Sequence, residues 1–143
     1  MIFWDSSAVV PLVVKERQSQ YCLELLSSDQ EMLVWCLTKV EVVSALCRKL
    51  RDGALDQENF RRAKTRLQEL LAHAHEVRAI DKVRARALRL LEVHPLRAAD
   101  ACQLAAALVA TQEDPTKVAF LTFDKRLEEV AQKEGFTVNP TAL

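Results

Sequence analysis

Met1-Ile2-Phe3-Trp4-Asp5-Ser6-Ser7 opens the sequence as four apolar residues followed by a carboxylate and two hydroxyls. A short apolar run of this kind indicates a buried strand. Asp5 then falls where the strand ends and the next helix begins. Because ligands of open α/β sheets bind at the carboxyl ends of strands, Asp5 is a candidate site residue. Asp and Ser also cap helices commonly, so capping by Asp5 or Ser6 explains this stretch equally well when it is taken alone.

Short apolar runs alternate with helical patterns along the rest of the chain. Further strands are predicted over residues 32–36, 77–80 and 118–123, with room for an edge strand over 136–138. The helical patterns cover residues 8–14, 18–28, 38–53, 56–75, 83–93, 96–111 and 125–133. Strands that alternate with helices form mainly parallel sheets. We therefore predict an α/β fold with a short, mainly parallel sheet of four to five strands and helices on both faces.

The composition fits one globular domain over residues 1–143. Few Gly and Pro leave little room for linkers, and no stretch reaches the ~18 apolar residues of a membrane span. The 20 basic and 20 acidic side chains cancel, but 13 basic and only 7 acidic residues fall between positions 48 and 97. Such a split is typical of a basic surface beside an acidic pocket, or of solvated helix faces. The four cysteines lack a C-x-x-C pair and indicate reduced thiols in a cytoplasmic protein.

Three further carboxylates stand at predicted helix starts. Glu41 follows Thr38 by three residues, which matches the S/T-x-x-E capping box, and it lies off the apolar stripe of its helix. Asp100 falls in the first turn of an alanine-rich helix, where it complements the helix dipole. It shares a stripe with Leu104, however, and is expected to turn inward. Asp124 directly follows the clearest strand of the chain, and a plain N-cap explains it too.

The predicted fold makes these acids more informative as a group. Asp5 and Asp124 end strands, and helices such as those of Glu41 and Asp100 begin at the same edge of a parallel sheet. Like charges at such range cannot all stay ionised without a cation. Mg²⁺ and Mn²⁺ prefer oxygen ligands of this type. A carboxylate cluster that holds such an ion suits phosphodiester chemistry, because the metal activates water and neutralises developing charge.

The chain also resembles the PIN-domain nucleases, in particular the VapC-type toxins of toxin–antitoxin pairs. The resemblance covers essentially the whole chain and rests on the segments IFWDSSA, LTKVEVVSAL, LRAADACQLAAAL and FLTFDKRL. The order and spacing of the acids match the four-carboxylate pattern of the family at Asp5, Glu41, Asp100 and Asp124. Ser7 and Thr122 match hydroxyl positions that often accompany this pattern. Any one motif is weak, but four in order are a strong signal.

The resemblance implies an endoribonuclease that depends on Mg²⁺ or Mn²⁺ and hydrolyses RNA to leave a 5′-phosphate. Asp5, Asp100 and Asp124 would bind the metal directly, and Glu41 would act through water or hold a second ion. The expected partner is a small antitoxin protein bound over the active-site groove, and many relatives are homodimers.

Basic side chains must offset the repulsion between an acidic pocket and a phosphate backbone. Arg48 is the first candidate for the RNA groove, because it lies two turns along from Glu41 on the same stripe of the predicted helix. Arg97, just before the helix of Asp100, is the second candidate. A third group, which solvation of a long helix explains equally well, consists of Arg61, Arg62, Lys64 and Arg66.

Other functions fit parts of the pattern. A phosphoaspartate enzyme also places an Asp after the first strand, but the dehalogenase-like pattern needs a second Asp where this chain has Ser7. A receiver domain needs an acidic pair near that strand and an Asp after the third. A metal-binding interaction module without catalysis would tolerate loss of the acids, and a metal titration separates it from a nuclease. A PIN-type RNA-processing nuclease without an antitoxin is the remaining alternative, and a neighbouring antitoxin gene would argue against it.

Overall fold

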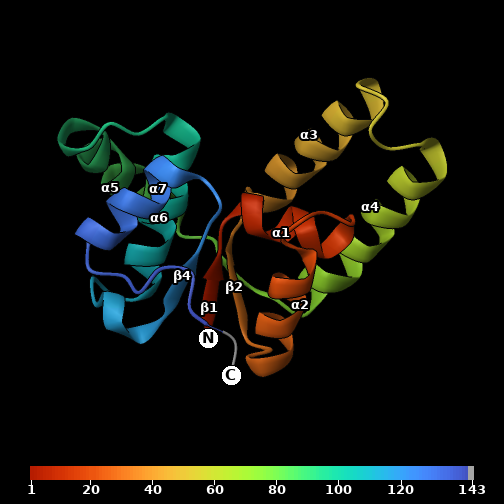
Figure 1. Ribbon diagram of the computed structural model, residues 1–143. Coiled ribbons are helices and arrows are strands. Elements are labelled where there is room, and N and C mark those ends of the chain that lie inside the picture. Colours follow the sequence, from red (N-terminus) through yellow and green to blue (C-terminus); the bar gives the residue numbers. More distant parts are fainter. Residues whose placement is uncertain (142–143) are drawn as a thin grey trace.

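Four strands form a central sheet in the computed structural model, which describes residues 1–141 (Figure 1). The strands are β1 (Ile2–Trp4), β2 (Met32–Trp35), β3 (His75–Val77) and β4 (Ala119–Leu121). Their order in the sheet is β3-β2-β1-β4, and every pairing between them is parallel. Phe3 of β1 lies opposite Leu33 on one side and Phe120 on the other. The predicted parallel α/β fold is confirmed, and the opening strand is central to the sheet.

Seven α-helices and one short 3-10 helix, η1 (Pro115–Lys117), connect the strands within the described residues. The α-helices are α1 (Ser6–Val13), α2 (Ser19–Ser28), α3 (Thr38–Arg51), α4 (Gln57–Ala72), α5 (Ile80–Val93), α6 (Ala98–Ala110) and α7 (Lys125–Lys133). Each predicted helical region overlaps one of them, although α1 and α5 begin two and three residues before the predicted starts. Gly53 follows α3 with a φ of 77°, a left-handed conformation that favours glycine beyond a helix end.

Alternate strand residues build two hydrophobic cores, one on each face of the sheet, because successive side chains of a strand point to opposite faces. Phe3 stacks on Phe120 with ring centroids 5.2 Å apart, in the core that α5, α6 and α7 cover. Trp4 belongs to the other core, beneath α1 to α4. Figure 1 shows the same division, with α1–α4 on one side of the sheet and α5–α7 on the other.

Two predicted strands differ from the structure. The strand expected over residues 77–80 lies at His75–Val77, because Val77 is the buried residue that pairs with Trp35 and Ile80 already begins α5. Residues 136–138 make a single bridge, from Val138 to Phe120, rather than an edge strand. Asn139 follows with a φ of 50°, which takes the chain out of the extended conformation.

The connections that follow β1 and β4 are short and lie at one edge of the sheet. One residue, Asp5, separates β1 from α1, and three residues ending with Asp124 separate β4 from α7. Because the two strands are parallel neighbours, their carboxyl ends meet at this edge. The fold therefore brings Asp5 and Asp124 close together from opposite ends of the chain.

The sequence predicts reduced thiols and no membrane span, and the structure describes both features. All four cysteines are free thiols. Burial raises the pKa of the Cys22 thiol to about 12, which makes it an inert packing residue. Within residues 1–141, no helix has the length and apolar character needed to cross a membrane.

Candidate active site

A cleft of about 600 Å³ lies at the carboxyl edge of the sheet. Four acids line it, although they come from four separate parts of the chain: Asp5, Glu41, Asp100 and Asp124. Ser7, Arg48 and Arg97 line the same cleft. Thr122 is fully buried and donates a hydrogen bond to Asp5. The structure thus brings the four predicted acids together with Ser7, Thr122, Arg48 and Arg97, but not the basic group Arg61, Arg62, Lys64 and Arg66.

Asp5 is the most buried acid of the cleft, with 3% of its surface exposed. Its Oδ2 accepts hydrogen bonds from Ser7 Oγ at 2.6 Å and from Thr122 Oγ1 at 2.8 Å. As the N-cap of α1 it also accepts a longer bond from the Ser7 amide at 3.4 Å. Burial raises the pKa of Asp5, and the bonds from Ser7 and Thr122 oppose that rise. Asp5 therefore both caps α1 and lines the cleft.

Ser7 and Thr122 join the ends of β1 and β4. Their hydroxyl oxygens lie 3.3 Å apart. Ser7 Oγ accepts a bond from the Phe123 amide at 2.9 Å, and Thr122 Oγ1 accepts one from the Asp124 amide at 3.1 Å. This network fixes the Asp5 carboxylate relative to the connection that carries Asp124.

The capping box that would explain Glu41 without a site does not form at the start of α3. Thr38 is the first residue of α3 rather than its N-cap, and the N-cap residue makes no side-chain capping bond. The Glu41 carboxylate instead accepts bonds from Ser6 Oγ at 3.2 Å and from Gln103 Nε2 at 3.0 Å. Burial, and then the charge of Asp5, raise the pKa of Glu41 to about 7. Glu41 lies in the first turn of α3, but its side chain contacts Ser6 and Gln103 instead of capping the helix. These contacts hold the carboxylate near the other acids.

Arg97 reaches both Asp100 and Asp124 at the mouth of the cleft. Its guanidinium lies 3.8 Å from Asp100 Oδ2 and 3.5 Å from Asp124 Oδ2, but its side chain is 77% exposed. Burial, and then the charges of Asp124 and Asp5, raise the pKa of Asp100 to about 6. Exposed ion pairs contribute little, so Arg97 does not balance the acids. Asp124 also caps α7, because its Oδ1 accepts a bond from the Leu127 amide at 2.9 Å.

The donor set of the cleft fits a hard divalent cation. The acids face one space closely enough for the charge of Asp5 to raise the pKa of both Glu41 and Asp100. Carboxylates that meet without a cation between them behave in this way. Oxygen donors of this kind suit Mg²⁺ or Mn²⁺. Within residues 1–141, however, no three acidic, histidine or cysteine side chains already surround one point at metal-binding positions. The donors are present, and their coordination geometry is not preformed.

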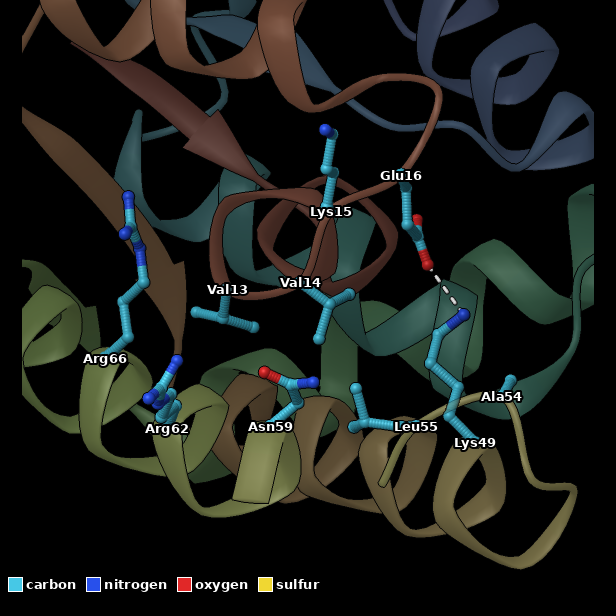
Figure 2. A pocket seen from close by; sticks show the side chains of 10 residues that line it. All are labelled: Val13, Val14, Lys15, Glu16, Lys49, Ala54, Leu55, Asn59, Arg62 and Arg66. Carbon is cyan, nitrogen blue, oxygen red and sulfur yellow. Dashed lines mark ion pairs between the residues drawn. The ribbon is translucent and has the colours of Figure 1, made fainter. Parts of the chain in front are cut away.

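A second, more basic pocket of about 430 Å³ lies further along α1 and α3, against α4 (Figure 2). Its basic lining residues are Lys15, Lys49, Arg62 and Arg66. Lys49 Nζ is paired with Glu16 at 2.7 Å, and Figure 2 shows Lys15 extending away from α4. These charges are partly paired and do not converge. Of the basic residues singled out in the sequence, Arg48 and Arg97 line the acidic cleft, whereas Arg62 and Arg66 line this second pocket.

Two polar side chains that contact Glu41 were not identified from the sequence. Ser6 looks there like a helix cap, and Gln103 lies in an alanine-rich helix where no motif marks it. In the structure Gln103 is fully buried. The one available signal is spacing, because Gln103 lies three residues after Asp100 and so on the same helical face.

Comparisons with known proteins agree with this geometry. The PIN domain family model matches residues 2–133, a range that includes all four acids of the cleft. Ribonuclease VapC45 of Mycobacterium tuberculosis is 30% identical over 143 residues, which cover the whole of this chain and 97% of that protein.

Solved structures share the fold at lower identity. FitAcB from Neisseria gonorrhoeae matches with a TM-score of 0.65 and 15% identity over 96% of both chains. A toxin–antitoxin complex from Klebsiella pneumoniae matches with a TM-score of 0.63 and 15% identity over 88% of both chains. At this identity the likeness bears on the fold alone.

Proposed function

The chain belongs to the PIN-domain family, and from this premise we propose that it is a VapC-type ribonuclease that hydrolyses RNA with the help of Mg²⁺ or Mn²⁺. One observation carries the proposal, the convergence on one cleft of Asp5, Glu41, Asp100 and Asp124. Helix capping explains some of these acids singly, but it does not explain why four separate segments direct acids into one space. The name of the M. tuberculosis relative supports RNA as the substrate.

Asp5, Asp100 and Asp124 are the residues that would hold the metal ion, and Glu41 would act through water or hold a second ion. When bound, such an ion activates water and neutralises the charge that develops on the phosphate. Ser7 and Thr122 contribute by fixing the orientation of the Asp5 carboxylate. A carboxylate that is held in place before the substrate arrives loses little freedom on binding.

Glu41 and the arginines supply the other functions of the site. Without a metal ion the pKa of Glu41 lies at about 7, and a bound cation would favour the ionised carboxylate that acts through water or holds a second ion. Arg48 and Arg97 line the same cleft, where they would contact phosphates of the RNA backbone. Their charge offsets the repulsion between the RNA backbone and the acids.

A toxin–antitoxin pair is the biological setting that we propose. The partner would be a small antitoxin protein that covers the cleft, in line with the VapC relative and with the neighbour solved as a toxin–antitoxin complex. Free thiols fit a cytoplasmic protein. A homodimer fits the exposed apolar side chains of α5, Leu88, Leu91 and Val93, and light scattering during size-exclusion chromatography measures it.

The direct test is cleavage of single-stranded RNA by purified protein that has been stripped of metal with EDTA. We expect no cleavage until Mg²⁺ or Mn²⁺ is restored, and products that carry a 5′-phosphate. Cleavage that persists in EDTA would contradict the role of the metal. Binding of Mn²⁺ without cleavage of any RNA would favour a non-catalytic interaction module.

A further inference from the structure

A buried amide side chain lies beneath the cleft. Gln103 is 0% exposed, in a stretch of α6 whose other buried residues are all Ala and Leu. Its Nε2 donates to Glu41 Oε2 at 3.0 Å and to Thr38 Oγ1 at 3.2 Å. Gln103 therefore connects α6 to the first turn of α3, across 62 residues of sequence.

The other half of this amide has no partner. Gln103 Oε1 makes no hydrogen bond within the described residues. A buried polar atom without a partner destabilises a fold, and an apolar side chain of similar size avoids that cost. The alanines and leucines around Gln103 show what packing alone requires at this place. What the amide adds to packing at this place is its pair of hydrogen bonds, to Glu41 and to Thr38.

The orientation of the amide follows from its partners. When Glu41 is ionised, as a metal ion in the cleft would favour, its carboxylate only accepts hydrogen bonds, and the NH₂ group of Gln103 faces it. The reverse orientation would set two acceptor oxygens against each other. With the amide turned in this way, the unpaired Oε1 is a consequence of the contact with Glu41.

Glu41 is held by one donor on each oxygen. Ser6 Oγ, at the start of α1, donates to Oε1 at 3.2 Å, and Gln103 Nε2, on α6, donates to Oε2 at 3.0 Å. Asp100 lies one turn before Gln103 on the same face of α6. A single helix thus supplies one acid of the cleft and holds a second acid that belongs to α3.

We propose that Gln103 is a positioning residue that directs the Glu41 carboxylate into the cleft. The inference rests on the proposed metal-assisted ribonuclease function. Gln103 itself touches neither RNA nor metal, and it acts through Glu41. Outer partners of metal-ligating carboxylates typically change metal affinity or activity by about 10–100-fold when they are removed.

The test replaces Gln103 by an apolar side chain of similar length, Gln103→Met. We expect the variant to stay folded, because loss of the unpaired Oε1 offsets part of the cost of losing the bonds to Thr38 and Glu41. The kcat of RNA cleavage should fall by about 10-fold or more while KM for RNA stays unchanged, and Mn²⁺, measured by the EPR signal of the free ion, should bind more weakly.

The matched control is Thr111→Val. Thr111 is also buried, at the C-terminal end of α6, but its hydroxyl donates only to the carbonyls of Ala107 and Leu108. This variant should leave kcat and Mn²⁺ affinity as in the wild type. A double-mutant cycle adds the second control: in a Glu41→Ala background, Gln103→Met should cause no further change in Mn²⁺ binding.

Several results would overturn the proposal. One is a Gln103→Met protein with wild-type kcat and Mn²⁺ affinity, and another is an equal loss of affinity in the Glu41→Ala background. Failure of both Gln103→Met and Gln103→Leu to fold would make Gln103 a structural residue. If the wild type binds Mn²⁺ but cuts no RNA, the proposed ribonuclease function fails, and the difference in Mn²⁺ affinity still decides the role of Gln103. A wild type that binds no Mn²⁺ overturns both.

Discussion

Asp5, Glu41 and Asp100 each have a pKa above the ordinary value for their side chain, and in each case burial is the main cause. Mutual repulsion adds to the rise at Glu41 and Asp100. Arg97, the closest cation to Asp100, is mostly exposed and balances little of this charge. At the scale of residues, the site is therefore a set of acids that gains stability from a proton or from a metal ion.

Metal binding should stabilise the fold through these residues. A ligand that binds only the native state adds about 2.7 kcal/mol of stability at 100 times its Kd, which raises the melting temperature by several degrees. We expect Mn²⁺ to raise the melting temperature of the wild type clearly more than that of Asp5→Asn or Asp100→Asn. Asp81→Asn, an exposed acid on α5, is the matched control and should respond like the wild type. Equal shifts in every protein would argue against a metal site in the cleft.

The pH dependence of stability has a defined sign. Glu41 and Asp100 have pKa values of about 7 and about 6 in the folded state, above the ordinary values near which they titrate when unfolded. Between the unfolded and the folded pKa the native state binds more protons, so these groups lower the free energy of unfolding as the pH rises through that window. Urea unfolding in EDTA should show this loss between about pH 4 and about pH 7. The loss should be smaller in Asp100→Asn, and an equal loss would contradict the assignment.

Among the secondary-structure elements, the N-terminal ends of four helices supply the acids of the cleft. The acids Glu41 and Asp100 stand in the first turns of α3 and α6, and Asp5 and Asp124 cap α1 and α7. Because α3 continues along the cleft, Arg48 comes to line it two turns beyond Glu41. Each helix therefore contributes an acid at the sheet edge, and α3 adds a cation beyond it.

Arg48→Ala should weaken RNA binding without changing Mn²⁺ affinity much. Each phosphate contact that is lost reduces the slope of log affinity against log salt by about 0.7 for a single strand. RNA binding measured with the Asp100→Asn protein over a range of salt separates this effect from cleavage. Arg89→Ala, an exposed arginine on α5 outside the cleft, is the matched control. If Arg48→Ala and Arg97→Ala both keep the affinity and salt slope, the groove lies elsewhere, most plainly along α4.

The elements also show what the sequence could and could not predict. Strand and helix positions follow from local apolar patterns, and the strand-to-helix connections at Asp5 and Asp124 followed with them. The capping box at Thr38 matched its local motif but is absent, because Gln103 bonds to both Thr38 and Glu41. Contacts of this kind join residues more than 60 positions apart, and no local pattern encodes them. The geometry around Glu41 was therefore out of reach of the sequence.

In the molecule as a whole, the two cores cover the faces of the sheet, and the cleft lies at its carboxyl edge. Helices α1–α4 cover one face and α5–α7 cover the other (Figure 1). The four acids come from both layers, because Asp5 caps α1 and Glu41 lies in α3, whereas Asp100 lies in α6 and Asp124 caps α7. If the cleft is the active site, this position between two packed layers would leave it open to RNA and to a protein that covers it. Such a site suits an enzyme that a partner controls.

The proposed role as a toxin predicts a cellular effect. Expression of the wild-type chain should arrest growth of a bacterial host, and expression of Asp5→Asn to the same level should not. Coexpression of the product of a small neighbouring gene should restore growth. Normal growth with an enzyme that cuts RNA in vitro would instead favour an RNA-processing nuclease without an antitoxin.

The most direct test of the central claim is the rate of RNA cleavage by Asp100→Asn at saturating Mg²⁺, with the fold checked by circular dichroism. Asn keeps the size of the side chain and removes its charge, and Asp100 makes no capping bond in α6 that the change could break. If the four acids form the active site, the rate falls by more than about 100-fold. Loss of a residue that only contacts a metal ligand typically costs about 10-fold to 100-fold. A folded Asp100→Asn protein that cuts RNA at the wild-type rate would contradict the account.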